Sequence, residues 1–214
     1  MAGAGMAELG PDGIRRCPWG IRVAEYREYH DAEWGRPVGE DQRVFEQLCL
    51  EGFRGGLPWL AILRRRAGFR RAFAGFDPVL VAEFTDDDVA RLLEDPAIVR
   101  HQDKIMATIG NARAVLRLRG RGLSLAELVW GFEGPRRRAP RSVADLATST
   151  PESEALAREL WRCGFRLIGP AGAYSAMQAL GVVNDHLDGC DFWAICDAGQ
   201  RAFARRVPRD PSET

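Results

Sequence analysis

The sequence lacks an excess of charge of either sign and has almost no lysine. Its 30 lysine and arginine residues balance 30 acidic residues, so the formal net charge is zero. This balance argues against binding nucleic acid through bulk charge, and any such binding must come from local clusters. Hydrophobic runs of membrane-spanning length are also missing. Residues 1–13 have no apolar centre and do not resemble a signal peptide, so we predict a cytoplasmic protein.

Lys104 is the only lysine among the 30 basic residues. One interpretation is that a bias toward arginine has replaced nearly every surface lysine and spared this one by chance. The other is that position 104 needs a compact ammonium charge, because the guanidinium group is bulkier, planar and differently hydrated. The sequence leaves both interpretations open.

The apolar residues recur with helical rather than strand spacing. A chain of 214 residues with 46% hydrophobic residues can form one compact domain or two closely packed lobes. We predict an all-α domain over 14–206, with disordered polar tails at 1–13 and 207–214. Helices are expected at 41–51, 58–71 and 100–118, and shorter ones after Asp77, Thr85 and Thr150, where capping residues precede helical patterns.

Two further segments have distinct compositions. Residues 133–141 are rich in arginine and proline and are predicted to form a loop. Residues 164–181, GFRLIGPAGAYSAMQALG, combine a short apolar entry, a glycine-bearing turn and a renewed helical pattern. This is the outline of a helix-hairpin-helix motif.

Cysteine and histidine occur in two pairs whose spacing suits a metal. The five cysteines of a cytoplasmic chain argue against a disulfide framework and leave metal binding or buried thiols. His186 and Cys190 are four residues apart and would share one face of a helix, and Cys17 and His30 form a second pair. Together they offer a closed Cys2His2 set, typical of structural zinc. For each pair alone, a buried histidine without metal is the alternative.

The remaining cysteines, Cys49, Cys163 and Cys196, lie in or near apolar stretches and are interpreted as buried thiols. Cys196 is the competing candidate for the fourth ligand.

Several motifs are similar to the 3-methyladenine DNA glycosylase I (Tag) family, in order and with compatible spacing, over about 14–190. They are Arg16-Cys17-Pro18-Trp19, Tyr29-His30-Asp31-Ala32-Glu33-Trp34-Gly35, Cys49-Leu50-Glu51-Gly52, Gly56-Leu57-Pro58-Trp59, Arg100-His101, Lys104-Ile105, Ile109-Gly110-Asn111-Ala112-Arg113-Ala114, Thr148-Ser149-Thr150, Met177-Gln178-Ala179 and Val183-Asn184-Asp185-His186.

The resemblance implies a helix-hairpin-helix DNA glycosylase of base-excision repair. It implies a zinc clip made by the four residues named above, and a base pocket lined by Glu51, Tyr29, Trp34 and Trp59. One departure lies beside that pocket, where Arg54-Gly55-Gly56-Leu57-Pro58-Trp59 replaces a run closer to Gln-Ala-Gly-Leu-Ser-Trp. Another lies in the hairpin, where Pro170-Ala171-Gly172 stands in place of residues that more often carry hydroxyl groups.

The implied substrate, a purine alkylated at N3, is a cation whose glycosidic bond is already weakened. Aromatic rings bind such a cation by cation-π contacts worth about 0.5–2 kcal/mol. The Glu51 carboxylate would favour the charged base and is the predicted catalytic group. The alternatives from residue type alone are a solvated helix-end acid for Glu51 and core packing for Trp59 and Trp34. No site role is predicted for Trp19, Trp130, Trp161 and Trp193.

Binding to duplex DNA is expected to use backbone N–H groups at the start of the hairpin's second helix, at Gly169, Ala171, Gly172 and Ala173, together with Lys104. Two arginine clusters could supplement this anchor or form solvated faces. They are Arg64, Arg65, Arg66, Arg70 and Arg71, and Arg136, Arg137, Arg138 and Arg141.

No lysine follows the hairpin, and Asp185 is the acid nearest the position of a catalytic aspartate. We therefore predict a monomeric hydrolase that releases 3-methyladenine or related bases from double-stranded DNA without lyase activity and without an organic cofactor. One alternative is a glycosylase for bulkier N3- or N7-alkylpurines. The other is a zinc-stapled module that binds damaged DNA without catalysis.

Overall fold

A computed structural model of the chain describes residues 5–204. The predicted tail at 207–214 and the predicted domain end at 206 lie outside this range. The described part is mostly helical, as predicted. Its α-helices are α1 (Ala24–Ala32), α2 (Asp41–Arg54), α3 (Trp59–Leu63), α4 (Arg66–Ala72), α5 (Pro78–Ala82), α6 (Asp86–Glu94), α7 (Gln102–Gly120), α8 (Leu125–Trp130), α9 (Pro151–Cys163), α10 (Pro170–Ala179) and α11 (Trp193–Ala204).

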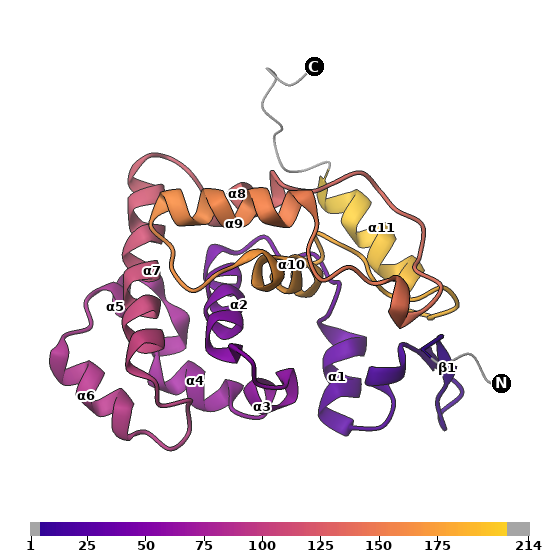
Figure 1. Cartoon of the computed structure of the whole chain (residues 1–214), viewed down its shortest axis with the longest axis horizontal. Helices are drawn as coiled ribbons and strands as arrows, with labels where there is room; N and C mark the ends of the chain where they lie inside the picture. Colours follow the sequence, from indigo (N-terminus) through magenta and orange to yellow (C-terminus); the bar gives the residue numbers. More distant parts are fainter. Residues whose placement is uncertain (1–4, 205–214) are drawn as a thin grey trace.

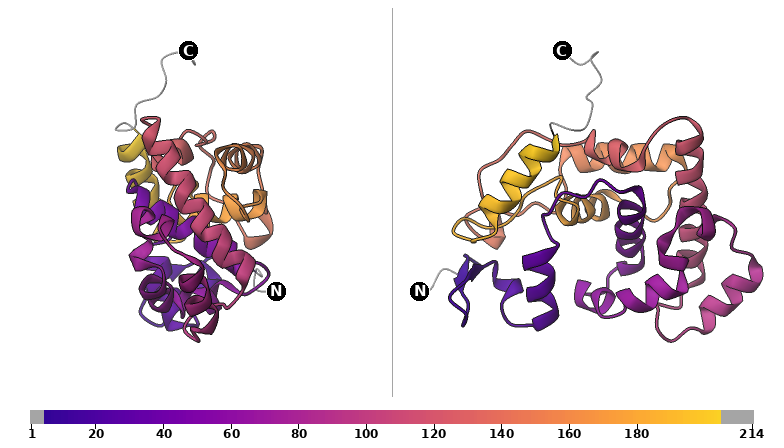
Figure 2. Two further views of the ribbon diagram at one scale, coloured as in Figure 1. Left: turned by 90° about the vertical axis from the view of Figure 1, so that its left-hand side faces the viewer. Right: turned by 180° about the vertical axis from the view of Figure 1, so that it is seen from behind.

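The helices α2 and α10 pack against each other at the centre of the molecule (Figure 1). On one side lies the long α7 with α4, α5 and α6, and on the other side lie α1 and α11. The view from behind in Figure 2 shows the same arrangement, with the first and last helices at one end. Segments far apart in sequence therefore meet at this end. Within residues 5–204, no helix has both the length and the apolar character needed to cross a membrane.

The N-terminal segment differs from the disordered tail predicted for 1–13. The strand β1 (Glu8–Leu9) pairs antiparallel with β2 (Arg15–Arg16). Gly5 is also engaged, because its carbonyl oxygen accepts a hydrogen bond from Val143 N at 2.8 Å. The prediction fails over 5–13 because these long-range partners are not visible in local composition.

Buried phenylalanines hold α2 against its neighbours. The apolar face of α2 carries Phe45 and Phe53, both at most 1% exposed. The ring of Phe53 lies 4.6 Å from that of Phe69 on α4, and the ring of Phe45 lies 6.0 Å from that of Phe76. Burying a side chain of this size contributes about 1.5–3 kcal/mol. This core fixes the helix that carries Glu51.

The sequence predicted most helices, merged two of them into one, and gave no prediction for α1, α8 and α11. The helix expected at 41–51 is α2, and the one expected at 100–118 is α7. Asp77 caps α5 through its side chain, and Thr85 forms a capping box at α6. The helix expected at 58–71 is instead two helices, α3 and α4, and the turn between them places arginines against α1.

The helix-hairpin-helix motif consists of α9, a turn over 164–169 and α10. Gly164 ends α9 in the left-handed conformation, with φ of 100°. Buried Asn111 on α7 pins the turn, since its Oδ1 accepts from Arg166 N at 2.7 Å and its Nδ2 donates to the Arg166 carbonyl at 3.2 Å. The predicted loop over 133–141 contains no helix or strand.

The start of α9 depends on a buried capping box. Thr150 is 6% exposed, its hydroxyl accepts from Ser153 N, and its own N–H donates to Ser153 Oγ. We expect Thr150→Ala to lower the free energy of unfolding by about 1–2 kcal/mol, measured by urea denaturation. Ser142→Ala removes an equivalent but exposed box from the short 3-10 helix Val143–Asp145 and should cost less than half as much. Equal losses would contradict the assigned role of burial.

Candidate active site

A cavity of about 210 Å³ lies where α1, the end of α2, the start of α3 and α10 meet. Its walls combine aromatic rings with a small number of polar groups. The lining residues are Trp19, Tyr26, Tyr29, Trp34, Glu51, Arg54, Trp59, Leu146, Ser175 and Gln178. The arrangement suits a flat ligand that offers both ring faces and polar edges.

The aromatic rings of the cavity support one another. The rings of Tyr29 and Trp59 are 5.7 Å apart, and those of Trp19 and Trp34 are 5.0 Å apart and perpendicular. Tyr26 ties α1 to α3, because its hydroxyl accepts a hydrogen bond from Leu60 N at 2.9 Å. The indole Nε1 of Trp59 is buried and has no hydrogen-bond partner in the structure. It is a donor available to a ligand.

Glu51 is the buried acid of the cavity, with 8% of its surface exposed. Burial raises the pKa of its carboxyl group from 4.5 to about 7, and the neighbouring Arg54 and Gln47 oppose this shift. Gln47 Nε2 donates to Glu51 Oε1 at 3.2 Å, and Arg54 NH1 donates to Glu51 Oε2 at 3.3 Å. Burial and nearby carboxylates, Glu51 first among them, also raise the pKa of Tyr29, which remains a neutral phenol.

The cavity opens onto a groove of about 650 Å³ that runs along the hairpin. Four residues line both spaces: Glu51, Arg54, Ser175 and Gln178. The groove is also lined by Gly52, Gly55, Gly56, Leu57, Lys104, Ala147, Thr148, Leu167, Gly169, Ala171, Gly172 and Tyr174. Glu51 and Trp59 therefore face one cavity whose mouth lies beside the hairpin.

The start of α10 faces this groove. Gly169 is its N-cap and Pro170 its first residue, so the N–H groups that follow have no partner within the helix. Ala171 and Gly172, which are predicted to bind DNA, line the groove. Ala173 differs from the prediction, because it is fully buried and its N–H donates to the Gly169 carbonyl at 2.8 Å. Its amide is not free to bind a phosphate.

Lys104 lies at the edge of the groove and binds the last turn of α2. Its Nζ donates to the Phe53 carbonyl oxygen at 2.8 Å. Partial burial lowers its pKa. The space is tight, since a Cβ added at Gly55, where φ is 33°, would lie 2.5 Å from Nζ. These contacts favour the interpretation that position 104 needs a compact ammonium group.

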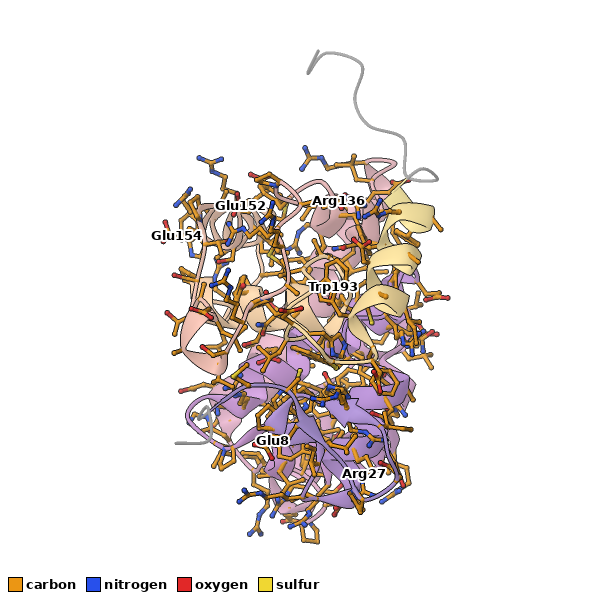
Figure 3. The ribbon with its side chains drawn as sticks, turned by 90° about the vertical axis from the view of Figure 1, so that its right-hand side faces the viewer. Glu8, Arg27, Arg136, Glu152, Glu154 and Trp193 are labelled. Atoms are coloured by element: carbon orange, nitrogen blue, oxygen red, sulfur yellow. The ribbon has the colours of Figure 1, made fainter. Side chains whose placement is uncertain are left out.

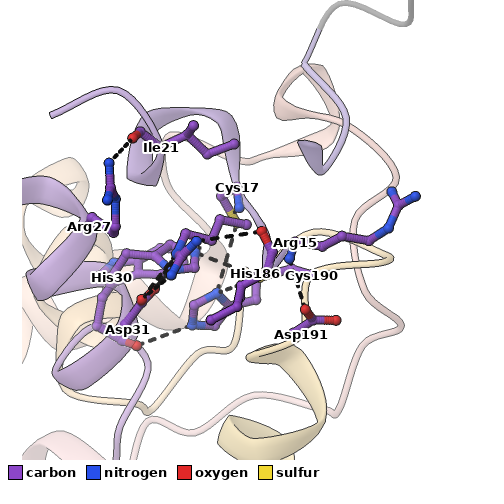
Figure 4. A network of polar contacts seen from close by, with 12 residues as sticks. Arg15, Cys17, Ile21, Arg27, His30, Asp31, His186, Cys190 and Asp191 are labelled. Atoms are coloured by element: carbon purple, nitrogen blue, oxygen red, sulfur yellow. Dashed lines mark hydrogen bonds and ion pairs between the residues drawn. The ribbon is translucent and has the colours of Figure 1, made fainter. Parts of the chain in front are cut away.

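The predicted ligands Cys17, His30, His186 and Cys190 converge. All four are buried, and their ligand atoms lie within 4.8 Å of one another. Cys190 Sγ is 3.5 Å from His186 Nδ1 and 3.7 Å from His30 Nε2, and Cys17 Sγ is 3.8 Å from His186 Nδ1 (Figure 4). A tetrahedral zinc ion with bonds of about 2.0–2.3 Å separates its ligands by about 3.3–3.8 Å. The donor set and its spacing fit structural zinc.

Outer contacts orient both histidines. His30 Nδ1 contacts Asp31 Oδ1 at 2.9 Å, and Arg16 grips the same carboxylate with two nitrogens. His186 Nε2 lies 3.2 Å from the carbonyl oxygen of Trp34. Such contacts fix the ring positions of metal-binding histidines. His186 and Cys190 meet through a turn rather than on one helix face, so their spacing indicated the right pair for a different geometric reason.

A family model for methyladenine glycosylases matches residues 19–194 of this 214-residue chain. The chain belongs to the methyladenine glycosylase family. DNA-3-methyladenine glycosylase 1 of Escherichia coli (strain K12) is 42% identical over 179 residues, which are 83% of this chain and 96% of the relative.

Solved structures of family members are similar to this chain over most of its length. A crystal structure of 3-methyladenine DNA glycosylase I has 43% identity and a TM-score of 0.80, covering 82% of this chain and 98% of that one. A structure of the Staphylococcus aureus enzyme, which describes recognition of 3-methyladenine, has 30% identity and a TM-score of 0.78 and covers 83% of this chain and 96% of that one.

This member of the methyladenine glycosylase family places Tyr29, Trp34, Glu51 and Trp59 together at the cavity, as expected. Trp19, for which the sequence analysis predicts no site role, also lines this cavity. Sequence reasoning also missed Tyr26, Arg54, Ser175 and Gln178 as lining residues. Trp19 and Tyr26 had a usable signal: one follows Cys17 by two residues, and the other precedes Tyr29 by one helical turn.

Five of the nine arginines in the two clusters form ion pairs: Arg64, Arg66, Arg70, Arg136 and Arg137. Arg64 pairs with Glu25 at 2.9 Å and Arg66 with Glu33 at 2.5 Å. In the loop over 133–141, Arg136 pairs with Asp197 at 3.1 Å, on the face shown in Figure 3. These contacts favour structural surfaces over free phosphate ligands. Among the other cysteines, Cys49 and Cys196 are buried as predicted, and Cys163 is half-buried.

Proposed function

We propose that this protein is a DNA-3-methyladenine glycosylase that hydrolyses the bond between an N3-alkylated purine and deoxyribose in duplex DNA. The observation that carries the proposal is the buried carboxylate of Glu51 in an aromatic cavity that opens beside the hairpin. Family relatives named for this activity support it. On this proposal the site recognises its substrate mainly by the positive charge of the damaged base.

The cavity suits a cationic purine better than a neutral one. Tyr29, Trp34 and Trp59 present ring faces and edges, and a desolvated cation gains about 2 kcal/mol or more from such rings. The ionised form of Glu51 adds an opposite charge in a place with little water. Undamaged adenine carries no positive charge and gains from neither effect to the same degree.

Cleavage of the glycosidic bond then needs little further catalytic assistance. The C1′–N9 bond breaks, its electron pair moves onto the purine and neutralises it, and water adds to C1′ and releases one proton. Glu51 holds the base while this charge changes, and the aromatic walls limit access of bulk water. Extruding the base from the duplex costs a few kcal/mol, and damaged pairs cost least.

DNA is held, on this proposal, by backbone groups more than by bulk charge. The free N–H groups at the start of α10, near Gly169, Ala171 and Gly172, face the groove and suit a phosphate. The single lysine of the chain is engaged with the Phe53 carbonyl, and no lysine follows the hairpin. Both observations support hydrolysis without Schiff-base lyase chemistry.

The cavity, the groove and the metal ligands are all built from one chain. This supports action as a monomer. A DNA substrate, together with relatives from bacteria, supports action in the cytoplasm of a bacterium.

The raised pKa of Glu51 gives base release a defined pH dependence. The ionised carboxylate is the form that attracts a cation, and its fraction rises as pH passes the pKa of about 7. We expect kcat/KM for 3-methyladenine release to rise between pH 5 and 8 with an apparent pKa of about 7. A profile that is flat over this range would contradict the role of the ionised form.

The direct test is chromatography of the bases that the purified protein releases from methylated duplex DNA, with zinc measured on the same sample. Release of free 3-methyladenine supports the proposal, and a panel of bulkier N3 and N7 adducts defines the substrate range. Tight binding to the damaged duplex without release of any base would contradict it and favour a binding module.

A further inference from the structure

Arg54 stands at the boundary between the cavity and the groove and is engaged on the cavity side. It is the last residue of α2, one turn beyond Glu51. Its NH1 lies 3.3 Å from Glu51 Oε2 and 3.1 Å from the hydroxyl oxygen of Ser175 on α10. Its side chain is 41% exposed, whereas that of Glu51 is 4% exposed. The guanidinium group therefore covers the mouth of the cavity from the groove side.

This contact conflicts with a cationic ligand. The carboxylate of Glu51 is the one acidic group among the residues that line the cavity, and Arg54 already pairs with it. A positively charged base at Glu51 and the guanidinium group would be like charges in a space of low polarity, which is unfavourable. The base can take full advantage of Glu51 only when Arg54 moves away.

The groove offers the place to which Arg54 would move. The basic residues that line the groove are Arg54 and Lys104, and the Lys104 ammonium group is engaged with the Phe53 carbonyl. A nucleotide whose base enters the cavity must leave its phosphates at the cavity mouth, where Arg54 and the N-terminus of α10 both lie. A guanidinium group pairs well with a phosphate.

We propose that Arg54 exchanges partners when DNA binds, leaving Glu51 and Ser175 for a phosphate beside the flipped nucleotide and so freeing Glu51 for the cationic base. This rests on the proposed function. In the free protein the Arg54 guanidinium group pairs with Glu51 in place of a cationic base. In the complex the Arg54 guanidinium group pairs with a phosphate of the DNA backbone instead. Binding of DNA and binding of the base therefore strengthen each other.

Arg54→Gln tests the exchange, because it removes the positive charge and keeps a side chain that can donate a hydrogen bond. Binding is measured for a duplex with a tetrahydrofuran abasic-site analogue at several salt concentrations. Because free 3-methyladenine is neutral, the base is represented by the fixed cation 3,9-dimethyladeninium, with and without a duplex that has a one-nucleotide gap and so leaves room for its 9-methyl group. We expect weaker duplex binding, with a slope of log K against log salt lower by about 1. We expect 3,9-dimethyladeninium to bind about two- to fivefold more tightly, since its competitor for Glu51 is gone.

In the unaltered protein the gapped duplex should tighten binding of 3,9-dimethyladeninium, and in Arg54→Gln this enhancement should disappear. Arg54→Lys keeps a positive charge and should restore the salt slope. The matched control is Arg91→Gln on α6, which removes another arginine paired with an acid three residues earlier. Arg91 lines neither the cavity nor the groove, so its variant should match the unaltered protein in every measurement.

An unchanged salt slope in Arg54→Gln would overturn the phosphate contact. Weaker binding of 3,9-dimethyladeninium in that variant would overturn the exchange and indicate that Arg54 only shapes the cavity. Failure of the proposed function has a different signature, in which the unaltered protein releases no base from methylated DNA whatever the slopes of the variants.

Discussion

Glu51→Gln should lower the rate of 3-methyladenine release by about 10²–10³-fold while the protein stays folded. Glutamine keeps the size of the side chain, and its single acceptor oxygen can keep one of the two hydrogen bonds that Gln47 and Arg54 now donate to different carboxylate oxygens. It removes the negative charge that would stabilise a cationic base in a cavity where the side chain is 4% exposed. Single-turnover release from methylated duplex DNA measures this effect without interference from product release.

The same substitution should not destabilise the protein at neutral pH. The folded protein raises the pKa of Glu51 from 4.5 to about 7, so it binds this proton more tightly than the unfolded chain does. Stability from this group is therefore full below pH 4.5 and is lost as pH rises toward 7, a cost of about 3 kcal/mol. Glutamine never ionises, so Glu51→Gln should unfold at an equal or higher temperature than the unaltered protein at pH 8. This advantage should shrink at pH 4.

Glu46→Gln is the matched control for this prediction. Glu46 lies on the same helix, is 9% exposed and pairs with Arg70 at 2.8 Å, but it does not line the cavity. Its variant should release 3-methyladenine at close to the normal rate. If Glu46→Gln lost as much activity as Glu51→Gln, or if Glu51→Gln melted earlier at pH 8, the loss would reflect damage to α2 rather than a missing charge.

Helix caps were predictable because they are decided by residues next to one another. Thr85 and Thr150 form the capping boxes that their local sequences indicate. The break between α3 and α4 was not predictable, because the run from Trp59 to Ala72 has helical spacing throughout. Ion pairs from Arg64 and Arg66 to acids on α1 and just after it accompany the break, and these partners are more than 30 residues away.

The residues of the candidate site also differ in whether local sequence could predict them. The metal ligands could be predicted from residue type, spacing and family resemblance, because few cysteines and histidines compete for the role. Ser175 and Gln178 could not, because serine and glutamine on a helix carry no sign of where the helix will pack. They reach the cavity only because α10 lies against α2, a consequence of the core that no local pattern records.

Cys190→Ser should abolish stoichiometric zinc and lower the melting temperature by about 10 °C or more. The four ligands join residues 17 and 30 to residues 186 and 190, and a link that closes a loop of more than a hundred residues contributes about 4–5 kcal/mol. In a domain of this size each kcal/mol moves the melting temperature by about 2–4 °C. Metal analysis and thermal unfolding, with and without a chelator, measure both effects.

Cys196→Ser is the control, since Cys196 is a buried thiol near the same helices but outside the ligand set. It should keep its zinc and should change stability by less than half as much. A chelator that leaves the melting temperature of the unaltered protein unchanged would contradict a structural metal, whatever the zinc content.

Loss of the metal should also weaken ligand binding in the cavity before it unfolds the rest of the protein. Trp19 follows Cys17 by two residues, Tyr29 precedes His30, and the Trp34 carbonyl contacts His186. The ligand set thus holds three of the rings that line the cavity, whereas α5, α6 and α7 form the far side of the molecule. With chelator below the melting temperature, binding of free 3-methyladenine should fall while helical circular dichroism is largely kept. Simultaneous loss of both signals would mean that the metal supports the whole fold and not the aromatic wall in particular.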